Sequence, residues 1–391
     1  MSRPPGNAAL TPFGTSIFTE MSALAVEHDA INLGQGFPDT DGPEEVLEAA
    51  RAAIAGGRNQ YPPGRGYPEL LTAIAAHQQR RYGLDLDPRT QILVTVGATE
   101  AIAMAMLALV EPGDEVVTFE PYYDSYAATI ALAGGVRRTS VLRFPDFAVA
   151  PESLRAAFSE RTRLVLINTP HNPTGKVFSR AELELICDLA REYDAWVVTD
   201  EVYEHLTFDG AEHLPVAALP GMFERTLTIS SAGKSFSTTG WKVGWVSGPA
   251  EAITALASVK QFVTFSASGP FQPAIAVGLG LPDEVYASLA SSLQAKRDLL
   301  LAGLQEMGVA AAVPAGTYFV VADVAPLCAR LGVNDALEFA RLLPERTGVA
   351  CVPVAAFCDD LEAARTLVRF AFCKEEDVLR EGIARLAQLT A

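Results

Sequence analysis

The sequence predicts an α/β protein with a mainly parallel sheet between helices, followed by a smaller α+β domain. Short runs of apolar residues alternate with helix-like segments from residue 91 onward. Most of these runs are largely apolar, which is typical of parallel strands buried on both faces of a sheet. Near Pro282 the alternation ends, and long helical segments then mix with isolated strands.

The first 45 residues are rich in Pro, Gly and Asp and hold only isolated apolar positions, so we expect an irregular arm. A helix is predicted over residues 43–55, where apolar side chains fall on one stripe. Gly56-Gly57 ends this helix, because glycine adopts the conformations that follow a helix at little cost.

Strands and helices then alternate up to residue 230. Pro112-Gly113 and Gly134-Gly135 close two of the predicted helices, and Ser179 with Glu182 forms a capping box at the start of a third. The predicted strands span 91–96, 115–119, 163–167, 195–199 and 226–230, and the predicted helices span 98–110, 122–133 and 179–193.

The C-terminal region is predicted to be α+β. Its expected helices span 284–303 and 335–345, and its expected strands span 318–322 and 367–372. We therefore expect three parts: an arm that also belongs to the small domain (1–45), a large domain (46–281) and a small C-terminal domain (282–391).

The composition is that of a folded globular protein with an acidic charge balance. Of the 391 residues, 49% are hydrophobic and 20% are charged, which argues against disorder. The formal net charge is −17. Nucleic acids and anionic membranes attract proteins with a local excess of Lys and Arg. We therefore expect neither as a partner.

The cysteines and histidines give no sign of a metal site. The five cysteines form no Cys-x-x-Cys pair, and the five histidines form no His-x-x-x-His pair. Reduced thiols in a cytoplasmic protein are the expected state. The N-terminal residues lack the apolar stretch of a signal peptide, and the longest apolar run, 101–110, is too short to span a bilayer.

Lys234 is the most informative single residue. It lies in the segment Ser231-Ala-Gly-Lys234-Ser-Phe, directly after an apolar run. A lysine in a tight, partly buried turn loses its proton readily, and only the free amine attacks a carbonyl to form a Schiff base. Gly233-Lys234-Ser235 also matches the end of a phosphate-binding loop, but Thr228 stands where that loop requires its first glycine.

Further polar segments follow predicted strands. Asn172 lies in a Pro/Asn turn, Asp200 follows the strand 195–199, and Gly97-Ala98-Thr99 joins a strand to a helix. Each segment on its own is explained as a turn, a helix cap or a junction. The carboxyl ends of parallel strands, however, meet at one edge of an open α/β sheet, where such folds bind ligands. A helix N-terminus at that edge also offers free amides to a phosphate.

Together these motifs resemble those of the class I/II, pyridoxal-phosphate-dependent aminotransferases of fold type I. The chain is most similar to the kynurenine/glutamine/methionine aminotransferase branch and to actinobacterial succinyldiaminopimelate aminotransferases. The similarity runs from Phe18 to the C-terminus and implies a seven-stranded main sheet and pyridoxal 5'-phosphate as the cofactor. Its motifs are Asn32-Leu-Gly-Gln-Gly-Phe-Pro-Asp39, Asn172-Pro-Thr-Gly175, Asp200-Glu-Val-Tyr203, Ser231-Ala-Gly-Lys234 and Val368-Arg-Phe370.

The resemblance assigns roles around the cofactor ring. Lys234 matches the Schiff-base lysine, which then acts as general base and acid. Asp200 matches the carboxylate that keeps the pyridine nitrogen protonated, so that the ring remains an electron sink. Asn172 and Tyr203 match the partners of the phenolic oxygen, and Tyr123, in Glu120-Pro-Tyr-Tyr-Asp124, matches the aromatic residue stacked on the ring.

The resemblance also implies a phosphate site and a homodimer. The amides of Ala98 and Thr99, with Ser231 and Lys242, match the phosphate cup, and a dianion fits a helix N-terminus beside a lysine. Tyr61 matches the tyrosine that reaches the phosphate of the neighbouring subunit. The active site is therefore expected to be shared across a homodimer.

Four further residues match substrate-binding positions, together with Asn172. Arg369 matches the arginine that holds the substrate α-carboxylate as a bidentate fork, although a surface arginine on an edge strand would show the same alternation. Gly36 would allow a close approach of substrate. Phe18 and Phe265 match aromatic residues of the side-chain pocket, though each could equally lie in the core.

The expected reaction is a two-step transamination between an L-amino acid and a 2-oxo acid. Methionine, glutamine or an aromatic amino acid is one class of donor, and N-succinyl-diaminopimelate is another. The latter would need a cation for its distal carboxylates, for which Arg65 is the candidate, with Arg58 also near Tyr61. Alternatives are β-elimination on cysteine conjugates at the same site, and a non-catalytic regulator of the same fold. A regulator is disfavoured because no DNA-binding segment is expected before Phe18.

Overall fold

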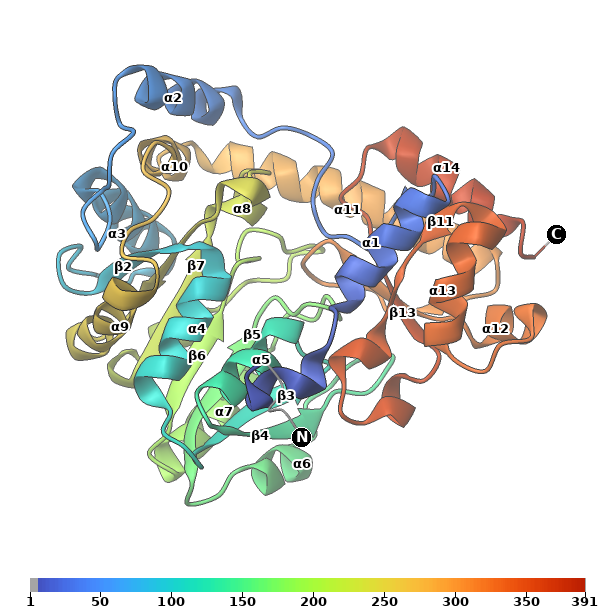
Figure 1. Ribbon diagram of the computed structural model, residues 1–391, viewed down its shortest axis with the longest axis horizontal. Coiled ribbons are helices and arrows are strands. Elements are labelled where there is room, and N and C mark those ends of the chain that lie inside the picture. The colour runs from blue at the N-terminus through green and yellow to red at the C-terminus, as the bar shows by residue number, and fades with distance from the viewer. Residues whose placement is uncertain (1–5, 391) are drawn as a thin grey trace.

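The computed structural model describes residues 6–390, which form a seven-stranded sheet between helices and a smaller α+β unit (Figure 1). The strand order of the large sheet is β2-β8-β7-β6-β5-β3-β4. Only β8 runs antiparallel to its neighbours. The strands are β2 (Ile92–Val96), β3 (Glu115–Glu120), β4 (Val136–Val141), β5 (Thr162–Asn168), β6 (Trp196–Asp200), β7 (Thr226–Ser231) and β8 (Val243–Ser247).

Two sets of helices cover the faces of this sheet. Apolar side chains of α4 (Gly97–Leu109), α5 (Asp124–Leu132) and α9 (Ala250–Val263) form one core with the strands. Side chains of α6 (Pro151–Ala157) and α7 (Arg180–Glu192) form a second core on the opposite face. The predicted mainly parallel sheet, buried on both faces, is therefore confirmed.

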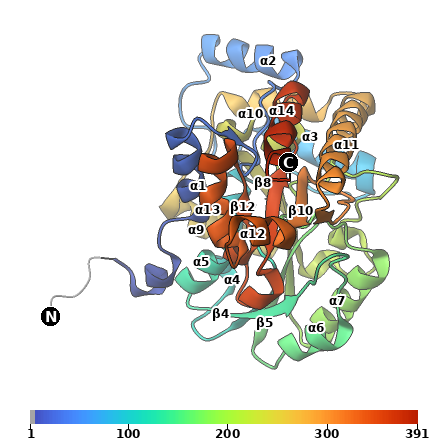
Figure 2. The same ribbon diagram turned by 90° about the vertical axis from the view of Figure 1, so that its right-hand side faces the viewer.

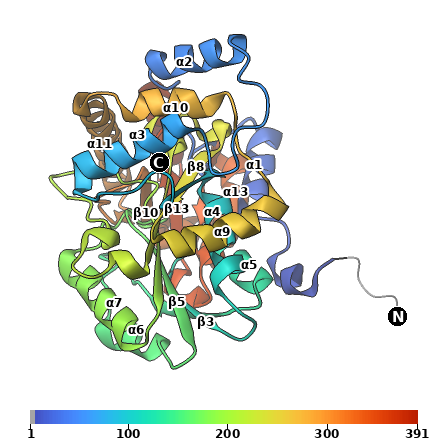
Figure 3. The same ribbon diagram turned by 90° about the vertical axis from the view of Figure 1, so that its left-hand side faces the viewer.

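A third helical group lies at the β2 end of the sheet. Figure 3 shows α2 (Glu44–Ala55), α3 (Pro68–Tyr82) and α10 (Phe271–Leu279) on the same side of the molecule, near β8. Their apolar side chains form one cluster with those of β2 and β8. The short helix α8 (Ala232–Ser235) follows β7 and carries Lys234.

The smaller unit is built from the last third of the chain and the N-terminal segment. Its antiparallel sheet has the order β12-β13-β10-β9, and β1 pairs in parallel with β11. Its strands are β1 (Ile31–Asn32), β9 (Ala310–Ala311), β10 (Phe319–Asp323), β11 (Val349–Ala350), β12 (Val352–Pro353) and β13 (Leu367–Ala371). Its helices are α1 (Ile17–Glu27), α11 (Asp283–Glu306), α12 (Ala325–Leu331), α13 (Ala336–Thr347) and α14 (Glu376–Ala387), and Figure 2 views the molecule from the side of this unit.

The N-terminal segment differs from the expected irregular arm. Residues 17–27 form α1, whose first turn is capped by Ser16 accepting a hydrogen bond from the amide of Thr19. Met21 and Ala25 bury one face of this helix against the small unit. Ile17, Phe18 and Leu24 also pack against this core at helical spacing, but the Pro, Gly and Asp of the surrounding residues concealed the helix. The division of the chain into domains stays a prediction.

The described residues include several 3-10 turns and no helix suited to a bilayer. The 3-10 turns span Ala8–Phe13, Val216–Ala218, Phe223–Arg225, Thr239–Trp241, Val354–Phe357 and Leu361–Ala364. None of the helices between residues 6 and 390 combines the length and the apolar character that a membrane crossing requires.

Candidate active site

A cavity of about 260 Å³ lies where the carboxyl ends of the central strands face the smaller unit. Most of the predicted site residues line it, although they come from segments more than 350 positions apart in the sequence. Those residues are Phe18, Gly36, Ala98, Thr99, Tyr123, Asn172, Asp200, Tyr203, Ser231, Lys234, Lys242 and Arg369.

Lys234 projects into this cavity from α8. The pKa of its amine is lowered from 10.5 to about 8. Burial is the main cause, and the nearby positive charges of Lys242 and Arg369 also lower it. The amine lies 5.7 Å from the ring centre of Tyr203 and 5.6 Å from that of Tyr318. Lys234 is still mostly charged at pH 7, but a far larger fraction of it is uncharged than of an ordinary lysine, and only the uncharged amine attacks a carbonyl.

Asp200 ends β6, the strand beside β7. Its Oδ2 accepts a hydrogen bond of 2.7 Å from the hydroxyl of Tyr126, and its Oδ1 accepts one of 3.3 Å from the amide of Val202. Burial raises the pKa of the Asp200 carboxyl to about 6. A buried carboxylate held only by a hydroxyl and an amide is stabilised by a cationic ligand in the cavity.

Arg369 lies at the centre of β13, between β10 and β12, and is 1% exposed. One guanidinium nitrogen donates to the side-chain oxygen of Asn172 at 2.8 Å, and another donates to the carbonyl of Gly34 at 2.7 Å. The guanidinium carbon lies 4.0 Å from the ring centre of Phe319. Burial lowers the pKa of Arg369 to about 10, and its Nε has no hydrogen-bond partner within the described chain. Arg369 is therefore a buried arginine and not a surface residue on an edge strand.

The turn between β2 and α4 is shaped for close contact. Gly97 begins α4 with a φ of +70°, which favours glycine. A Cβ built on Gly97 would lie 3.1 Å from the amine of Lys242, so this lysine lies directly over the turn. A Cβ on Gly244 of β8 would lie 2.5 Å from the carbonyl carbon of Gly97. The helix N-terminus and Lys242 together give this end of the cavity a positive potential.

Two predicted site residues do not line the cavity of their own chain. Tyr61 is 81% exposed and Phe265 is 51% exposed, and their rings meet edge to face with centres 5.6 Å apart. Arg58 pairs with Glu69, and Arg65 donates to the carbonyl of Thr90 and the hydroxyl of Thr254. Neither arginine is among the lining residues.

The structure adds residues that sequence reasoning missed. The hydroxyl of Tyr126 donates a hydrogen bond to the carboxylate of Asp200. The side chain of Asn168 donates to the backbone carbonyl of Asp200 and accepts from the amide of Asn172, which links the two segments. Phe37 and Phe319 line the cavity. Tyr126 stands three residues after Tyr123 on α5, and this helical spacing was the one available signal.

Comparison with known proteins agrees with this geometry. The sequence pattern of the family "Aminotransferase class I and II" matches residues 28–386. The probable N-succinyldiaminopimelate aminotransferase DapC of Mycobacterium tuberculosis is 52% identical over 391 residues, with 97% of each chain covered. The methionine aminotransferase of Escherichia coli is 42% identical over 380 residues, with 97% of each chain covered.

The fold agrees as well. The solved structure of N-succinyldiaminopimelate aminotransferase from M. tuberculosis superposes with a TM-score of 0.95, covering 98% of this chain and 100% of the other. The predicted fold type I is therefore confirmed. On its sequence, its fold and the matched length, this chain belongs to the class I and II aminotransferases and is an enzyme that transfers amino groups.

Proposed function

We propose that this aminotransferase binds pyridoxal 5'-phosphate at Lys234 and moves an amino group from an L-amino acid to a 2-oxo acid in two half-reactions. The observation that carries the proposal is the meeting of three charged groups in one cavity. Lys234, with a pKa near 8, lies on α8 directly after β7. The buried carboxylate of Asp200 ends β6, and the buried Arg369 lies on β13.

The residues present fit this cofactor at each of its polar groups. Asp200 lacks a bonded cation among the described residues and would pair with a protonated pyridine nitrogen. The N-terminus of α4, Ser231 and Lys242 would hold the phosphate. Asn172 and Tyr203 would donate to the ring oxygen, and Tyr123 would stack on the ring.

The chain's own residues then account for amino transfer. When bound, pyridoxal phosphate supplies an electron sink for the bond broken at the substrate α-carbon. The amine of Lys234, freed when the substrate amine takes its place, would remove the proton from the substrate α-carbon as a base and donate a proton as an acid later in the transfer. Arg369 would hold the α-carboxylate through two parallel hydrogen bonds, for which Asn172 already orients the guanidinium. The aromatic side chains that line the cavity would keep water from the reacting atoms.

Two donor classes are proposed, each on a different observation. The 52% identity to the M. tuberculosis protein favours N-succinyl-diaminopimelate. The rings of Phe18, Phe37, Tyr123 and Phe319 favour methionine or an aromatic amino acid, as does the 42% identity to the E. coli protein. The lining cations are Lys234, Lys242 and Arg369, so distal carboxylates would have to be met at the mouth of the cavity or by a second subunit.

A panel of donors separates these classes. Each donor is mixed with the purified enzyme, and the change in cofactor absorbance is followed in a single turnover, with Lys234→Ala as the inactive control. A kcat/KM for N-succinyl-diaminopimelate at least tenfold above that for methionine and kynurenine supports the first class. The reverse ranking supports the second. Release of pyruvate from a cysteine conjugate faster than any amino transfer would instead support the β-elimination alternative.

We further propose a homodimer in which Tyr61 and Phe265 complete the cavity of the neighbouring subunit. The support is the exposure of an apolar group formed by Tyr61, Phe262, Val263 and Phe265, since aromatic side chains in such a group mark an interface. Mixing Lys234→Ala with Tyr61→Ala protein tests the sharing. Hybrid dimers should restore activity that neither parent shows, whereas additive activity of the parents would count against a shared site.

A further inference from the structure

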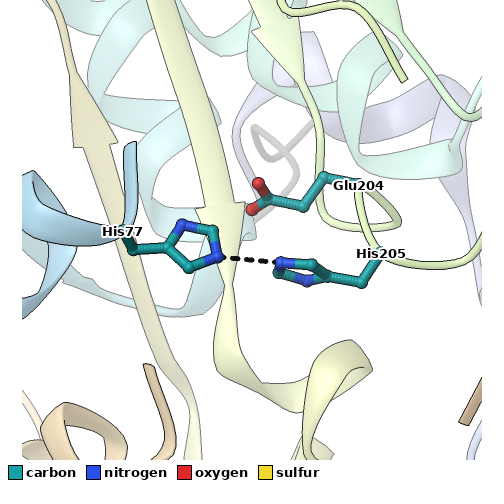
Figure 4. Close-up of side chains that lie close together, drawn as sticks. All are labelled: His77, Glu204 and His205. Carbon is teal, nitrogen blue, oxygen red and sulfur yellow. Dashed lines mark hydrogen bonds between the residues drawn. The ribbon is translucent and has the colours of Figure 1, made fainter. Parts of the chain in front are cut away.

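Next to α8 lies a buried cluster of three side chains that do not line the cavity: His77 of α3, with Glu204 and His205 from the turn after β6 (Figure 4). The two histidines meet through a hydrogen bond of 2.9 Å between their Nε2 atoms. The Nδ1 of His205 shares a hydrogen bond of 2.7 Å with the hydroxyl of Ser235, the residue next to Lys234.

The three side chains have the composition of a metal site, with donor atoms within 4.8 Å of one another. Their donor atoms are nevertheless already engaged. Glu204 accepts hydrogen bonds from the hydroxyls of Ser230 at 2.6 Å and Tyr82 at 2.8 Å. Of the histidine nitrogens, only the Nδ1 of His77 lacks a partner in the described chain. A metal ion would have to break this network, so the geometry favours a closed set of hydrogen bonds.

This network joins the two chain segments that carry the proposed catalytic groups. Glu204 and His205 directly follow Tyr203, and their partners Ser230 and Ser235 stand on β7 and α8. Two side-chain hydrogen bonds thus cross-link these segments. The ring of His205 is also stacked on Tyr286 of α11, with centres 4.3 Å apart, so helices on two sides hold it in place.

A side-chain anchor matters here because α8 has only four residues. Its helical backbone hydrogen bond runs from the amide of Phe236 to the carbonyl of Ala232. A helix this short is not stable by itself and depends on tertiary contacts. The position of the Lys234 side chain therefore depends on what holds Ser235.

We propose that His205, held by His77 and Tyr286, is a positioning residue that fixes α8 through Ser235 and so keeps the amine of Lys234 in its buried place. The inference rests on the proposed role of Lys234. It acts through geometry and not through a proton on the histidines. Burial lowers the pKa of His205 to about 3 and also lowers that of His77, so both rings are neutral at the pH of the reaction.

The expected consequence is a change in the proton affinity of Lys234. Burial is the largest cause that lowers the pKa of Lys234. If α8 loosens, water reaches this nitrogen and the charged form becomes more favourable. The titratable and charged groups that surround the nitrogen are Asp200, Tyr203, Lys242, Tyr318, Arg369 and Cys373. Those that face His205 are His77, Arg81, Glu204, His213 and Tyr286. A substitution at Ser235 alters none of them.

The test compares Ser235→Ala, His205→Leu and His205→Asn with the wild-type holoenzyme. The pH midpoint of the cofactor absorbance reports the proton affinity of the nitrogen that Lys234 contributes. Ser235→Ala and His205→Leu should raise this midpoint by about one pH unit. His205→Asn should leave it near the wild-type value, because the asparagine amide can replace the Nδ1 atom opposite Ser235. Ser140→Ala is the matched control: it removes a buried hydroxyl of β4 bonded to Ser153, far from α8, and should change nothing.

Two results would overturn the inference. One is a pH midpoint of the cofactor absorbance in Ser235→Ala that equals the wild-type value. This substitution removes a single oxygen atom and leaves the packing of the core unchanged. The other is one equivalent of zinc in the purified enzyme that His77→Gln abolishes, which would assign the cluster to a metal. Borohydride reduction and peptide mapping accompany each variant. A cofactor found on a residue other than Lys234 would contradict the proposed function of Lys234. This result is distinct from one that contradicts only the positioning role of His205.

Discussion

Lys234 and Asp200 are two buried groups that destabilise the protein as long as no ligand accompanies them. Burial lowers the pKa of Lys234 to about 8 and raises that of Asp200 to about 6. At neutral pH both groups carry charge in an environment that disfavours charge. A ligand that takes up the amine and brings a positive ring nitrogen to the carboxylate removes both costs, so cofactor binding and folding are coupled.

Replacing Lys234 by Met is expected to stabilise the cofactor-free protein at pH 7. The folded pKa of about 8 lies below the ordinary value of 10.5. The unfolded chain therefore binds the proton more tightly, and wild-type stability rises with pH from 8 to 10.5. Removing the amine should raise the free energy of unfolding by about 3 kcal/mol at pH 7. It should also flatten the dependence of this free energy on pH between 8 and 10.5. Denaturant titrations at several pH values measure both effects, with Lys296→Met of α11 as the control. Equal slopes for wild type and Lys234→Met would contradict the burial of the amine.

Arg369→Lys is expected to impair substrate binding although the substitution keeps the positive charge. A lysine cannot make the two parallel hydrogen bonds to a carboxylate or remain bonded to Asn172 and Gly34 at once. The kcat/KM for amino acids should fall about 100-fold, equivalent to about 3 kcal/mol. Steady-state kinetics should be repeated with an amine that lacks the carboxylate, whose slow turnover should not change. An equal loss for both substrates would mean that Arg369 acts by another route.

At the scale of elements, the contact between β8 and the first turn of α4 shapes the proposed phosphate site. A methyl group at Gly244 would press on the carbonyl carbon of Gly97 at 2.5 Å, whereas one at Gly240 meets nothing within 4 Å. Gly244→Ala is therefore expected to weaken cofactor binding at least tenfold, about 1.4 kcal/mol, and Gly240→Ala to leave it unchanged. Fluorescence titration of the stripped proteins with the cofactor measures both. Similar affinities for the two variants would contradict the tight packing.

The elements that the sequence predicted well are those with a simple physical signature. β5 and β6 each hold a run of consecutive apolar residues, Leu164 to Ile167 and Trp196 to Val198, because both faces of these strands are covered, and the capping box of α7 is present as expected. β4 was missed because it is an edge strand with two arginines, and β8 was missed because it contains a glycine and runs antiparallel. The helix α1 was missed because only two of its side chains are fully buried.

Some residues of the site could be predicted from the sequence and others could not. Lys234, Asp200 and Arg369 were predicted because family motifs surround them in the sequence. Tyr126 and His205 carry no such motif. Tyr126 meets Asp200 across 74 positions, and His77 meets His205 across 128 positions. Only the folded chain brings these pairs together, so their roles could not be derived from local sequence.

At the scale of the whole molecule, the cavity is formed jointly by the two units of the chain. Arg369 of the small unit bonds to Asn172 of the large one, and Lys374 bonds to the carbonyl of Phe37 and to Asp39 at 2.9 Å each. The segment after β1 is thereby held over the site. The exposed apolar group of Tyr61, Phe262, Val263 and Phe265 is where a second copy of the chain is proposed to bind.

Phe262→Asp is expected to break the proposed dimer. Phe262 is 85% exposed at the end of α9, and a buried charge at a subunit interface is strongly unfavourable. Sedimentation should show a dimer for the wild type and a monomer with weak cofactor binding for the variant. Val26→Asp on α1 is the matched control, since Val26 is similarly exposed at 83% but lies outside the aromatic group. A dimeric Phe262→Asp protein would place the interface elsewhere.

The central claim is that Lys234 carries the cofactor and is displaced from it by the amino group of a substrate. Borohydride reduction of the holoenzyme followed by peptide mapping tests this directly. The account predicts one cofactor adduct per chain, on Lys234, and its loss when an amino donor is added before the reductant. An adduct on another lysine, or one that a saturating donor does not remove, would contradict the account.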